Sequence, residues 1–241
     1  MNKVQNAFDR AADTYDQHCH AQQQAGNKLT QLVKLHHAHA DRLIDFGCGT
    51  GVNTYQLAAQ FDYQDFHAID ISSALLQKAE QHIKKSRIHF YQMDFDHLPD
   101  DCLAFDIIYS NMALQWSVNL PALLNKTHAL LKTQGTLGFS IPLAGTFREF
   151  QSHCAMNNFP EKKIIHDLLT DCGYELLSQK TDTITFSFHD TLRALKSIKQ
   201  IGANHVIQRT HKGLRTPSYL NQIKTSELTY VIGYFIARKS A

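Results

Sequence analysis

The sequence predicts an α/β protein built on a mostly parallel sheet with helices on both faces. Between residues 41 and 142, short apolar runs typical of buried strands alternate with segments of helical length. A Gly-x-Gly-x-Gly run, Gly47 to Gly51, directly follows the first of these strands. The next two strands each end at or near an acidic residue, Asp70 and Asp94. Because ligands bind such sheets at the carboxyl ends of the strands, these features also predict a binding site there.

The composition restricts the class of protein. With 241 residues and 43% hydrophobic content, the chain is long enough for one domain with a sizeable core. Its five cysteines are scattered, odd in number and without a Cys-x-x-Cys pair, which argues against a disulfide framework and favours a reducing compartment. The sequence contains no signal pattern and no apolar run near the roughly 20 residues of a membrane span. We therefore expect a cytoplasmic protein that does not bind a membrane.

Charge and histidine content indicate the kind of partner. The net charge of +2 is uneven, because residues 190–241 carry nine Lys/Arg against two Asp/Glu, whereas the first 189 carry 15 against 20. This asymmetry predicts that the C-terminal part faces an acidic partner. Nucleic acid is disfavoured, since few aromatic residues lie among the basic ones. The fifteen histidines, including His36-His37-Ala38-His39, have no Cys or carboxylate at ligand spacing, so we expect no metal site.

The first 38 residues precede the strand–helix alternation and have almost no glycine or proline. We expect residues 4–38 to be helical. Residues 8–16 have two interpretations that the pattern leaves open. They are either a helix packed on the edge of the domain or a flap that closes over a bound cofactor, with Tyr15 as its aromatic contact.

The alternating region predicts these elements in order: strand 43–44, helix 52–59, strand 66–69, helix 72–84 with Ser72 as N-cap, strands 88–91 and 105–109, helix 121–132 and strand 137–141. Beyond Ala144 the pattern changes. There we expect a helix over 146–158 that carries Arg148 in a lid, helix 161–172, strand 174–188, helix 191–201 capped by Asp190, a short helix at 219–225 and strand 230–237.

On the helix at 191–201, apolar and basic residues occupy adjoining arcs. The apolar arc comprises Leu192, Ala194, Leu195, Ile198 and Ile201, which can pack against the sheet. The basic arc comprises Arg193, Lys196 and Lys199. Two interpretations of the basic arc are an ordinary solvated face and a docking surface for an acidic protein, and the charge asymmetry favours docking.

The glycine run predicts a cradle for a ligand. Glycine permits positive φ and close approach of the backbone, and the N–H groups that open the following helix favour a polar or anionic group. The spacing excludes a dinucleotide fingerprint, since the third glycine would fall at Val52 or Thr54. A P-loop is excluded because Gly51 is followed by Val52-Asn53. An NAD-dependent dehydrogenase is therefore disfavoured.

Three acids at strand ends predict the contacts of a nucleoside. Asp70 lies 19 residues after Gly51, near the spacing at which an acid accepts hydrogen bonds from ribose hydroxyls. Asp94, between Met93 and Phe95, suits an adenine amino group with apolar cover for the ring. Asp45 is placed either to accept from a ligand's ammonium group or to brace the turn.

The run from Asp45 to Gly51 resembles Asp-x-Gly-x-Gly-x-Gly, the first motif of class I S-adenosylmethionine-dependent methyltransferases. Four further segments, at 8–15, 110–116, 195–203 and 228–230, resemble the malonyl-acyl-carrier-protein O-methyltransferases of biotin synthesis. Leu114-Gln115-Trp116 and Lys199-Gln200-Ile201-Gly202-Ala203 are the more family-specific of these, and the resemblance spans essentially the whole chain. Departures are Phe46, at a position that is often smaller, and the connection 203–218, which matches less clearly.

The resemblance implies a Rossmann-like class I methyltransferase fold, with a seven-stranded sheet whose last strand is antiparallel. It implies S-adenosylmethionine as methyl donor and a malonyl group on acyl carrier protein as substrate, in an early step of biotin (pimeloyl) synthesis. We expect a single domain, in which 1–40 form the N-terminal helical flap, 41–142 the donor-binding half and 143–241 the lid and substrate-side half. Whether acyl carrier protein or coenzyme A carries the malonyl group, and which oligomer forms, stays open.

The expected contacts divide into two groups. For the donor they are Tyr15, Asp45, Gly47, Cys48, Gly49, Gly51, Asp70, Ile71, Asp94, Phe95 and Ser110. For the substrate they are Gln115, Trp116, Arg148, Lys196 and Lys199. The malonyl carboxylate is ionised at pH 7 and needs no general base, so the enzyme has to position it and exclude water. A cation should orient it, and Arg148 is the candidate, although a surface position is its common alternative.

Two rival functions stay open at this stage. One is a class I methyltransferase that acts on a quinone or another small molecule. The other is a protein that binds S-adenosylmethionine without turnover.

Overall fold

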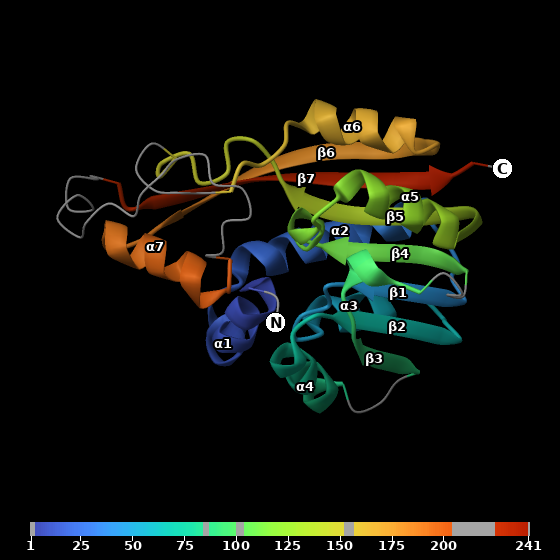
Figure 1. Cartoon of the computed structure of the whole chain (residues 1–241), viewed down its shortest axis with the longest axis horizontal. Coiled ribbons are helices and arrows are strands. Elements are labelled where there is room, and N and C mark those ends of the chain that lie inside the picture. Colours follow the sequence, from blue (N-terminus) through green and yellow to red (C-terminus); the bar gives the residue numbers. More distant parts are fainter. Residues whose placement is uncertain (1–2, 84–86, 100–103, 152–156, 204–224, 241) are drawn as a thin grey trace.

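A seven-stranded sheet forms the centre of the computed structural model, which describes residues 3–83, 87–99, 104–151, 157–203 and 225–240 (Figure 1). The strands are β1 (Arg42–Phe46), β2 (Asp65–Asp70), β3 (Ile88–Gln92), β4 (Phe105–Asn111), β5 (Leu131–Pro142), β6 (Tyr174–Ser187) and β7 (Glu227–Lys239). Their order across the sheet is β3-β2-β1-β4-β5-β7-β6. Neighbours from β3 to β5 are parallel, and β7 pairs antiparallel with both β5 and β6. The expected class I methyltransferase sheet, with its last strand antiparallel, is confirmed.

Helices cover both faces of this sheet. They are α1 (Lys3–His18), α2 (His20–His36), α3 (Val52–Ala58), α4 (Ser73–His82), α5 (Leu120–Leu130), α6 (Lys162–Asp171) and α7 (Thr191–Gln200), with short 3-10 turns η1 (Phe95–His97) and η2 (Leu114–Trp116). Apolar residues of α2, α3, α4 and α7 share one core with one face of the strands, and those of α5 and α6 share a second core with the other face. Alternate strand residues therefore point to opposite layers, as a parallel sheet buried on both faces requires.

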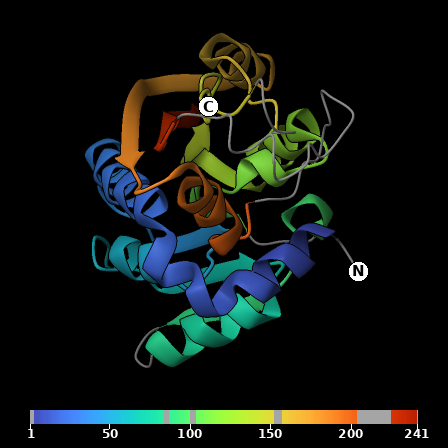
Figure 2. The same cartoon turned by 90° about the vertical axis from the view of Figure 1, so that its left-hand side faces the viewer.

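Helix α1 lies with α7 at one end of the sheet (Figures 1 and 2). The Thr14 hydroxyl donates to the Gln200 carbonyl over 3.0 Å. Phe8 packs so closely on Gly202 that a Cβ there would lie 2.7 Å from the ring. The first and the last helix of the described chain are thus one packed unit beside the carboxyl ends of the strands.

Local capping explains where two of the helices begin. The Ser72 hydroxyl accepts from the Leu75 N–H at the start of α4, and the Asp190 carboxylate accepts from the Arg193 N–H at the start of α7. Both caps were predicted and are confirmed. The last strand is longer than predicted, since β7 continues on both sides of residues 230–237 through its pairing with β6.

The expected helical character of residues 4–38 is confirmed for α1 and α2, which meet at Cys19. Two other expectations need correction. The helix expected over 146–158 is absent from its described part, where residues 144–151 form turns tied to β7 by hydrogen bonds such as Phe147 N–H to Thr229 O. Leu192 was placed on the packed arc of α7, but it is 57% exposed because the helix buries Ala194, Ser197 and Ile198 instead.

Two expected features lie outside the described residues. They are the connection 208–218 and all but the last residue of the short helix expected at 219–225. Within the described part of the chain, no helix is long and apolar enough to cross a membrane. Nor do the described residues contain a group of three His, Cys, Asp or Glu side chains that could hold a metal ion.

Candidate active site

The glycine turn after β1 is fixed to the end of β2. The N–H groups of Gly47 and Cys48 both donate to the Ile69 carbonyl, over 2.9 and 3.0 Å. Gly49 has φ +58°, which a residue with a side chain adopts only at a cost. A Cβ added there would meet nothing closer than the Tyr15 ring at 3.9 Å, so the backbone of Gly49 borders open space.

The other two glycines allow close packing within the protein. A Cβ on Gly47 would lie 2.4 Å from the Ala113 methyl, and one on Gly51 would lie 2.9 Å from Ile83 of the segment after α4. Gly47 therefore lets the segment after β4 approach the turn, and Gly51 lets α3 begin against α4. Only the middle glycine leaves room that a ligand would fill.

Asp70 ends β2 beneath this turn and is 8% exposed. Its carboxylate accepts from the N–H groups of Gly49 and Ser72, each over 2.8 Å. Burial raises the pKa of Asp70 to about 6, although the two hydrogen bonds lower it. The group is therefore largely ionised at neutral pH. Because it borders a cavity, its remaining lone pairs can accept hydrogen bonds from a ligand's hydroxyl groups.

Asp45 lies at the end of β1 but faces the interior, with 1% exposure. Its Oδ2 accepts from the Thr54 hydroxyl of α3 over 2.6 Å. Burial raises its pKa to about 7, while the hydrogen bond from Thr54 lowers it. Of the two roles expected for Asp45, this geometry fits the brace between β1 and α3, and Asp45 is not among the residues that border the cavity.

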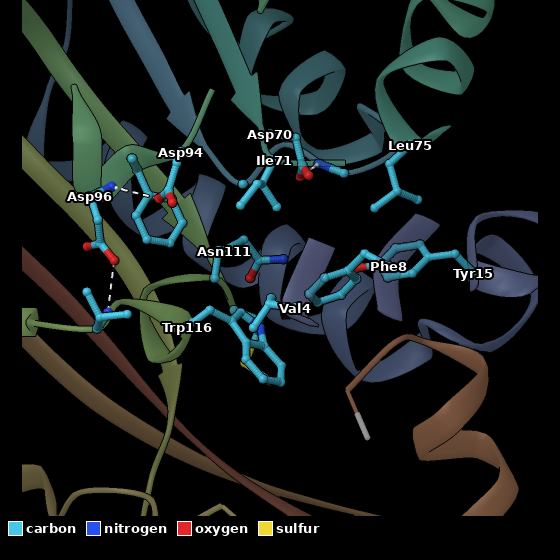
Figure 3. Close-up of a pocket in the computed structure, with 16 residues that line it drawn as sticks. Val4, Phe8, Tyr15, Asp70, Ile71, Leu75, Asp94, Asp96, Asn111 and Trp116 are labelled. Atoms are coloured by element: carbon cyan, nitrogen blue, oxygen red, sulfur yellow. Dashed lines mark hydrogen bonds between the residues drawn. The ribbon is translucent and has the colours of Figure 1, made fainter. Parts of the chain in front are cut away.

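The space between atoms in the cavity beside Gly49 amounts to about 660 Å³, part of which is open to solvent (Figure 3). Seven of the expected donor contacts border it: Tyr15, Gly47, Gly49, Asp70, Ile71, Asp94 and Phe95. Four others do not: Asp45, Cys48, Gly51 and Ser110. Ser110 is fully buried and donates from its hydroxyl to the Phe46 carbonyl, so it joins β4 to the end of β1.

Asp94 lies on the far side of the cavity from Tyr15 (Figure 3), and Phe95 also borders the cavity. Asp94 caps η1 by accepting from the Asp96 N–H over 3.0 Å. Phe95 stacks on Phe46, with ring centroids 6.2 Å apart. The next acid, Asp96, accepts from the Ser117 hydroxyl and the Val118 N–H, which ties η1 to the segment after η2. An aromatic ring beside an acceptor suits a flat heterocycle that bears an amino group.

Helix α1 closes the cavity on its remaining side. The Asp9 carboxylate accepts from the Ser72 hydroxyl over 2.6 Å, and Asp16 accepts from the Thr50 hydroxyl over 2.6 Å. Both bonds attach α1 to the segments that carry the glycine turn and Asp70. Tyr15 is thereby partly buried between them, and desolvation raises the pKa of its hydroxyl, which stays protonated.

Several residues that border the cavity were not expected from the sequence. They are Val4, Phe8, Leu75, Asp96, Asn111, Met112, Ala113 and Val118. Asn111 is the one with a sequence signal, since it is polar and directly ends the apolar strand β4. Its Nδ2 donates to the Gln22 carbonyl and its Oδ1 accepts from the Ser140 hydroxyl, so it links α2, β4 and β5.

The expected substrate contacts fall in four places. Trp116 borders the cavity, with Phe8 edge-on to its ring at 5.6 Å. Gln115 borders two neighbouring cavities. Arg148 is 61% exposed, and its Nε lies 3.6 Å from Glu149. Lys196 and Lys199 are exposed on α7, away from the cavity lining.

The chemical groups that border the cavity beside Gly49 fit S-adenosylmethionine. Asp70 offers an acceptor for ribose hydroxyls, Asp94 and Phe95 suit adenine, and the bare backbone at Gly49 allows close approach. No side chain in the described lining is placed as a base beside a nucleophile. The arrangement can hold a nucleoside-bearing donor and keep water from its reactive end.

Comparisons with known proteins agree with this fit. Residues 37–201 match a family model described as a methyltransferase domain. Malonyl-[acyl-carrier protein] O-methyltransferase 2 of Coxiella burnetii is 37% identical over 98% of this chain and 96% of its own length.

Two solved structures share the fold. One is a protein of Bacillus halodurans provisionally assigned as a methyltransferase, with a TM-score of 0.66, 16% identity, and coverage of 90% of this chain and 99% of that one. The other is the N-methyltransferase NodS of Bradyrhizobium japonicum in complex with S-adenosyl-L-homocysteine. Its TM-score is 0.56 and its identity 14%, over 88% of this chain and 85% of NodS.

Proposed function

Because the chain belongs to the family of malonyl-[acyl-carrier protein] O-methyltransferases, we propose that it methylates the free carboxyl of a malonyl thioester held on acyl carrier protein. The methyl donor is S-adenosylmethionine. The observation that carries the proposal is the 37% identity to a protein of that name over 98% of the chain. The cavity that combines Gly49, Asp70 and Asp94 supports it.

The donor supplies a methyl group bound to a positively charged sulfur. In this chain, Asp70 would hold the ribose and Asp94 with Phe95 the adenine, while the Gly47–Gly49 backbone would lie along the rest of the donor. A carboxylate is already ionised at neutral pH, since the ordinary pKa of a carboxyl group is about 4. The residues therefore have to align its oxygen with the methyl carbon and remove water from both, and no proton transfer is required.

Helix α1 is the element that excludes water in this scheme. Phe8 and Tyr15 cover the cavity from the side opposite the sheet, and Phe8 contacts Trp116. The hydrogen bonds from Ser72 and Thr50 to Asp9 and Asp16 hold the helix in this position. Both acids are on the helix, and both hydroxyls are beside the glycine turn. Opening of α1 would therefore expose the cavity and break these bonds together.

We place the carrier protein on α7. Its Lys196 and Lys199 are exposed, and Leu192 adds an exposed apolar side chain on the same helix. The third basic residue, Arg193, lies 3.7 Å from Asp190 and is partly neutralised. An acidic carrier would be steered by the two lysines, so the association rate should fall as salt rises.

The test of the proposed activity uses labelled S-adenosylmethionine and a panel of acceptors. The panel contains malonyl-acyl carrier protein, malonyl-coenzyme A, free malonate and a quinone precursor with a phenolic hydroxyl. We expect base-labile label on the malonyl thioesters and the fastest turnover on the carrier-bound form. Label on the phenol alone would contradict the proposal. Donor binding without label on any acceptor would indicate a binding protein.

The docking surface is tested by the double substitution Lys196→Glu and Lys199→Glu. We expect the KM for malonyl-acyl carrier protein to rise about tenfold at low salt, because two attractive charges become repulsive. The matched control is Lys162→Glu with Lys163→Glu, two exposed lysines on α6. Equal KM values for the two double mutants would exclude α7 as the docking surface.

A further inference from the structure

A second cavity lies beside the one that borders the glycine turn, and the two share Met112 and Trp116. Its space between atoms amounts to about 340 Å³, part of which is open to solvent. Its lining comes from α2, the segment after β4, the end of β5 and the turn after it, the segment before α6, the segment that follows α7, and β7. Ile201 and Ala203 border it just beyond the C-terminus of α7, so it lies between the donor cavity and the helix that carries Lys196 and Lys199.

The described lining of this second cavity carries no Asp, Glu, Lys or Arg. Its polar side chains include Gln22, Gln115 and Tyr230. Tyr230 is 6% exposed, and its ring lies edge-on to those of Phe147 and Phe186. Burial raises the pKa of the Tyr230 hydroxyl, so it keeps its proton and remains a donor.

Gln115 contributes an amide oxygen that accepts no hydrogen bond from the described residues. Its Nε2 donates to the Met112 carbonyl over 2.6 Å, which fixes the orientation of the amide. Within the described chain, its Oε1 is then buried without a partner, as is the Oε1 of Gln22. A buried polar atom left unpaired costs about 1–3 kcal/mol. The cavity is therefore suited to a ligand that brings both an acceptor for Tyr230 and N–H donors for the amide oxygens.

Building on the proposed function, we propose that this cavity receives the acyl end of the thioester substrate. In it, the Tyr230 hydroxyl donates to the attacking carboxylate, and the Gln115 amide oxygen accepts from an amide N–H of the arm that bears the thioester. The arms that carry acyl thioesters contain such amides, whereas free malonate and quinones have no N–H group.

A neutral donor suits this reaction better than a cation does. The carboxylate oxygen forms a bond to the methyl carbon while the S–C bond breaks, and the bonding electron pair stays on sulfur. The negative charge of the carboxylate and the positive charge of the sulfonium both disappear. A lysine or arginine on the carboxylate would stabilise the charged ground state, which slows the step, whereas a hydroxyl orients the oxygen with a smaller such effect.

The position of Arg148 agrees with this assignment. It is 61% exposed, lies 3.6 Å from Glu149, and does not border either cavity. The adjoining Thr146 borders the second cavity, but its hydroxyl is engaged with the Val231 backbone. We therefore assign the orientation of the carboxylate to Tyr230 rather than to Arg148.

Tyr230→Phe tests the first contact, with Tyr234→Phe as the matched control. Tyr234 is on the same strand and buried, but its hydroxyl interacts with Asp182 and not with the cavity. We expect Tyr230→Phe to lower kcat for malonyl-acyl carrier protein about tenfold or more, with unchanged affinity for S-adenosylhomocysteine. Tyr234→Phe should leave kcat unchanged. An unaltered kcat in Tyr230→Phe would overturn the assignment, as would an equal loss of S-adenosylhomocysteine binding.

Gln115→Met tests the second contact with two small substrates. Malonyl-N-acetylcysteamine carries an amide N–H, and the S-ethyl thioester of malonate does not. Loss of the Met112 hydrogen bond affects both substrates equally. We expect the KM to rise about tenfold for the amide-bearing thioester alone. An equal change for both substrates would overturn the contact.

The wild-type protein separates failure of this inference from failure of the proposed function. If it methylates malonyl thioesters while Tyr230→Phe is as active, only the assignment of Tyr230 is wrong. If it methylates no malonyl thioester, both the proposed function and the acyl cavity are excluded.

Discussion

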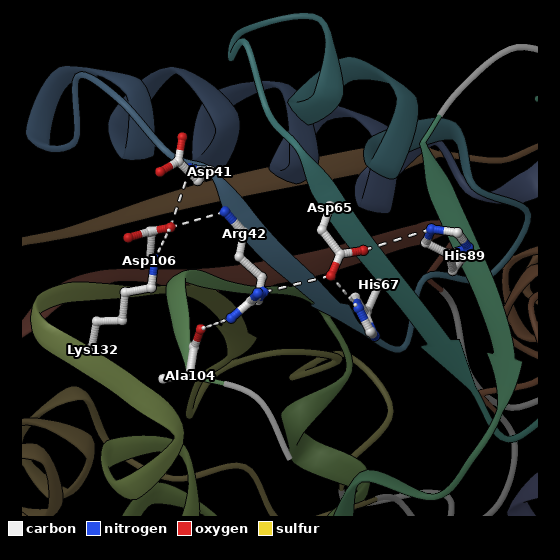
Figure 4. A network of polar contacts seen from close by, with 8 residues as sticks. All are labelled: Asp41, Arg42, Asp65, His67, His89, Ala104, Asp106 and Lys132. Carbon is white, nitrogen blue, oxygen red and sulfur yellow. Dashed lines mark hydrogen bonds and ion pairs between the residues drawn. The ribbon is translucent and has the colours of Figure 1, made fainter.

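At the amino ends of the strands, Asp65 and Asp106 contact cations (Figure 4), whereas at the carboxyl ends Asp45 and Asp70 accept from hydroxyl or N–H groups. Asp106 accepts from Lys132 over 2.8 Å and from the N–H groups of Arg42 and Asp41. Burial would raise the pKa of Asp106, but these bonds outweigh it and lower the pKa. At the carboxyl ends, burial dominates and raises the pKa of both Asp45 and Asp70.

The carboxylates at the amino ends tie neighbouring strands together, whereas those at the carboxyl ends either border the cavity or point into the interior. Asp65 Oδ2 lies 3.5 Å from Arg42 Nε and 2.9 Å from His67 Nε2, so the negative charge of Asp65 has a cationic partner in the protein itself. Asp70 lies beside a cavity with no cation in its described lining. A donor with a positively charged sulfur would supply the positive charge that the described lining lacks. This comparison leads to five predictions.

The largest expected effect concerns Asp70. Asp70→Ala should weaken binding of S-adenosylhomocysteine by roughly 1–3 kcal/mol, because ribose hydroxyls and the Gly49 N–H lose their acceptor. Isothermal titration calorimetry measures this loss. Asp106→Ala is the matched control and should leave the affinity within about twofold. Equal affinities for wild type and Asp70→Ala would remove Asp70 from the donor site.

Asp45 should act on stability through pH. Its pKa in the folded protein, about 7, exceeds the ordinary value of 3.8. Between these values the folded protein holds a proton that the unfolded chain has released, so the free energy of unfolding falls as pH rises through this window. The side chain of Asp45→Asn cannot ionise. Between pH 5 and pH 8, the free energy of unfolding of this variant should therefore fall by about 2 kcal/mol less than that of wild type. Urea unfolding at both pH values measures the difference.

The same variant tests the role of Asp45 in binding. A brace to Thr54 predicts that Asp45→Asn binds S-adenosylhomocysteine within about twofold of wild type, since an amide oxygen can still accept from that hydroxyl. A tenfold loss would instead support the contact with the donor's ammonium group.

Asp106 should stabilise the fold without affecting the site. Asp106→Ala should reduce the free energy of unfolding by about 1 kcal/mol at pH 7, because two backbone N–H groups lose an acceptor and a partly exposed ion pair is lost. Since the folded pKa of Asp106 is lowered, this contribution is present above its ordinary pKa and disappears as pH falls through the folded value. An unchanged unfolding midpoint in urea at pH 7 would contradict it.

The smallest expected effect is a change in the protection of the α1 amides from hydrogen exchange, without a change in the fold. If α1 is a flap, S-adenosylhomocysteine should slow amide hydrogen exchange in residues 4–20 and leave the amino ends of β1, β2 and β4 unchanged. Hydrogen-exchange mass spectrometry measures both regions in one experiment. Equal protection of residues 4–20 with and without the ligand would make α1 a static part of the fold.

Local sequence determined the framework of this protein. Buried strands, helix caps at Ser72 and Asp190, and the glycine turn each depend on a few neighbouring residues, so their patterns are visible without a structure. The spacing from Gly51 to Asp70 likewise reflects one helix between two parallel strands. These features fix the sheet and bring Gly49, Asp70 and Asp94 to the same cavity.

Tertiary packing decided what the individual residues contact. Asp45 and Asp70 both end strands beside the same turn, but only Asp70 borders the cavity, because Asp45 points into the interior toward Thr54. Phe8 and Asn111 reach the cavity from α1 and β4 through contacts with residues about 90 or more positions away, at Gly202, Trp116 and Gln22. Leu192 lies outside the core because α7 packs its Ala194 and Ile198 face inward. Periodicity places a residue on an arc of a helix, but the neighbouring elements decide which part of that arc is buried.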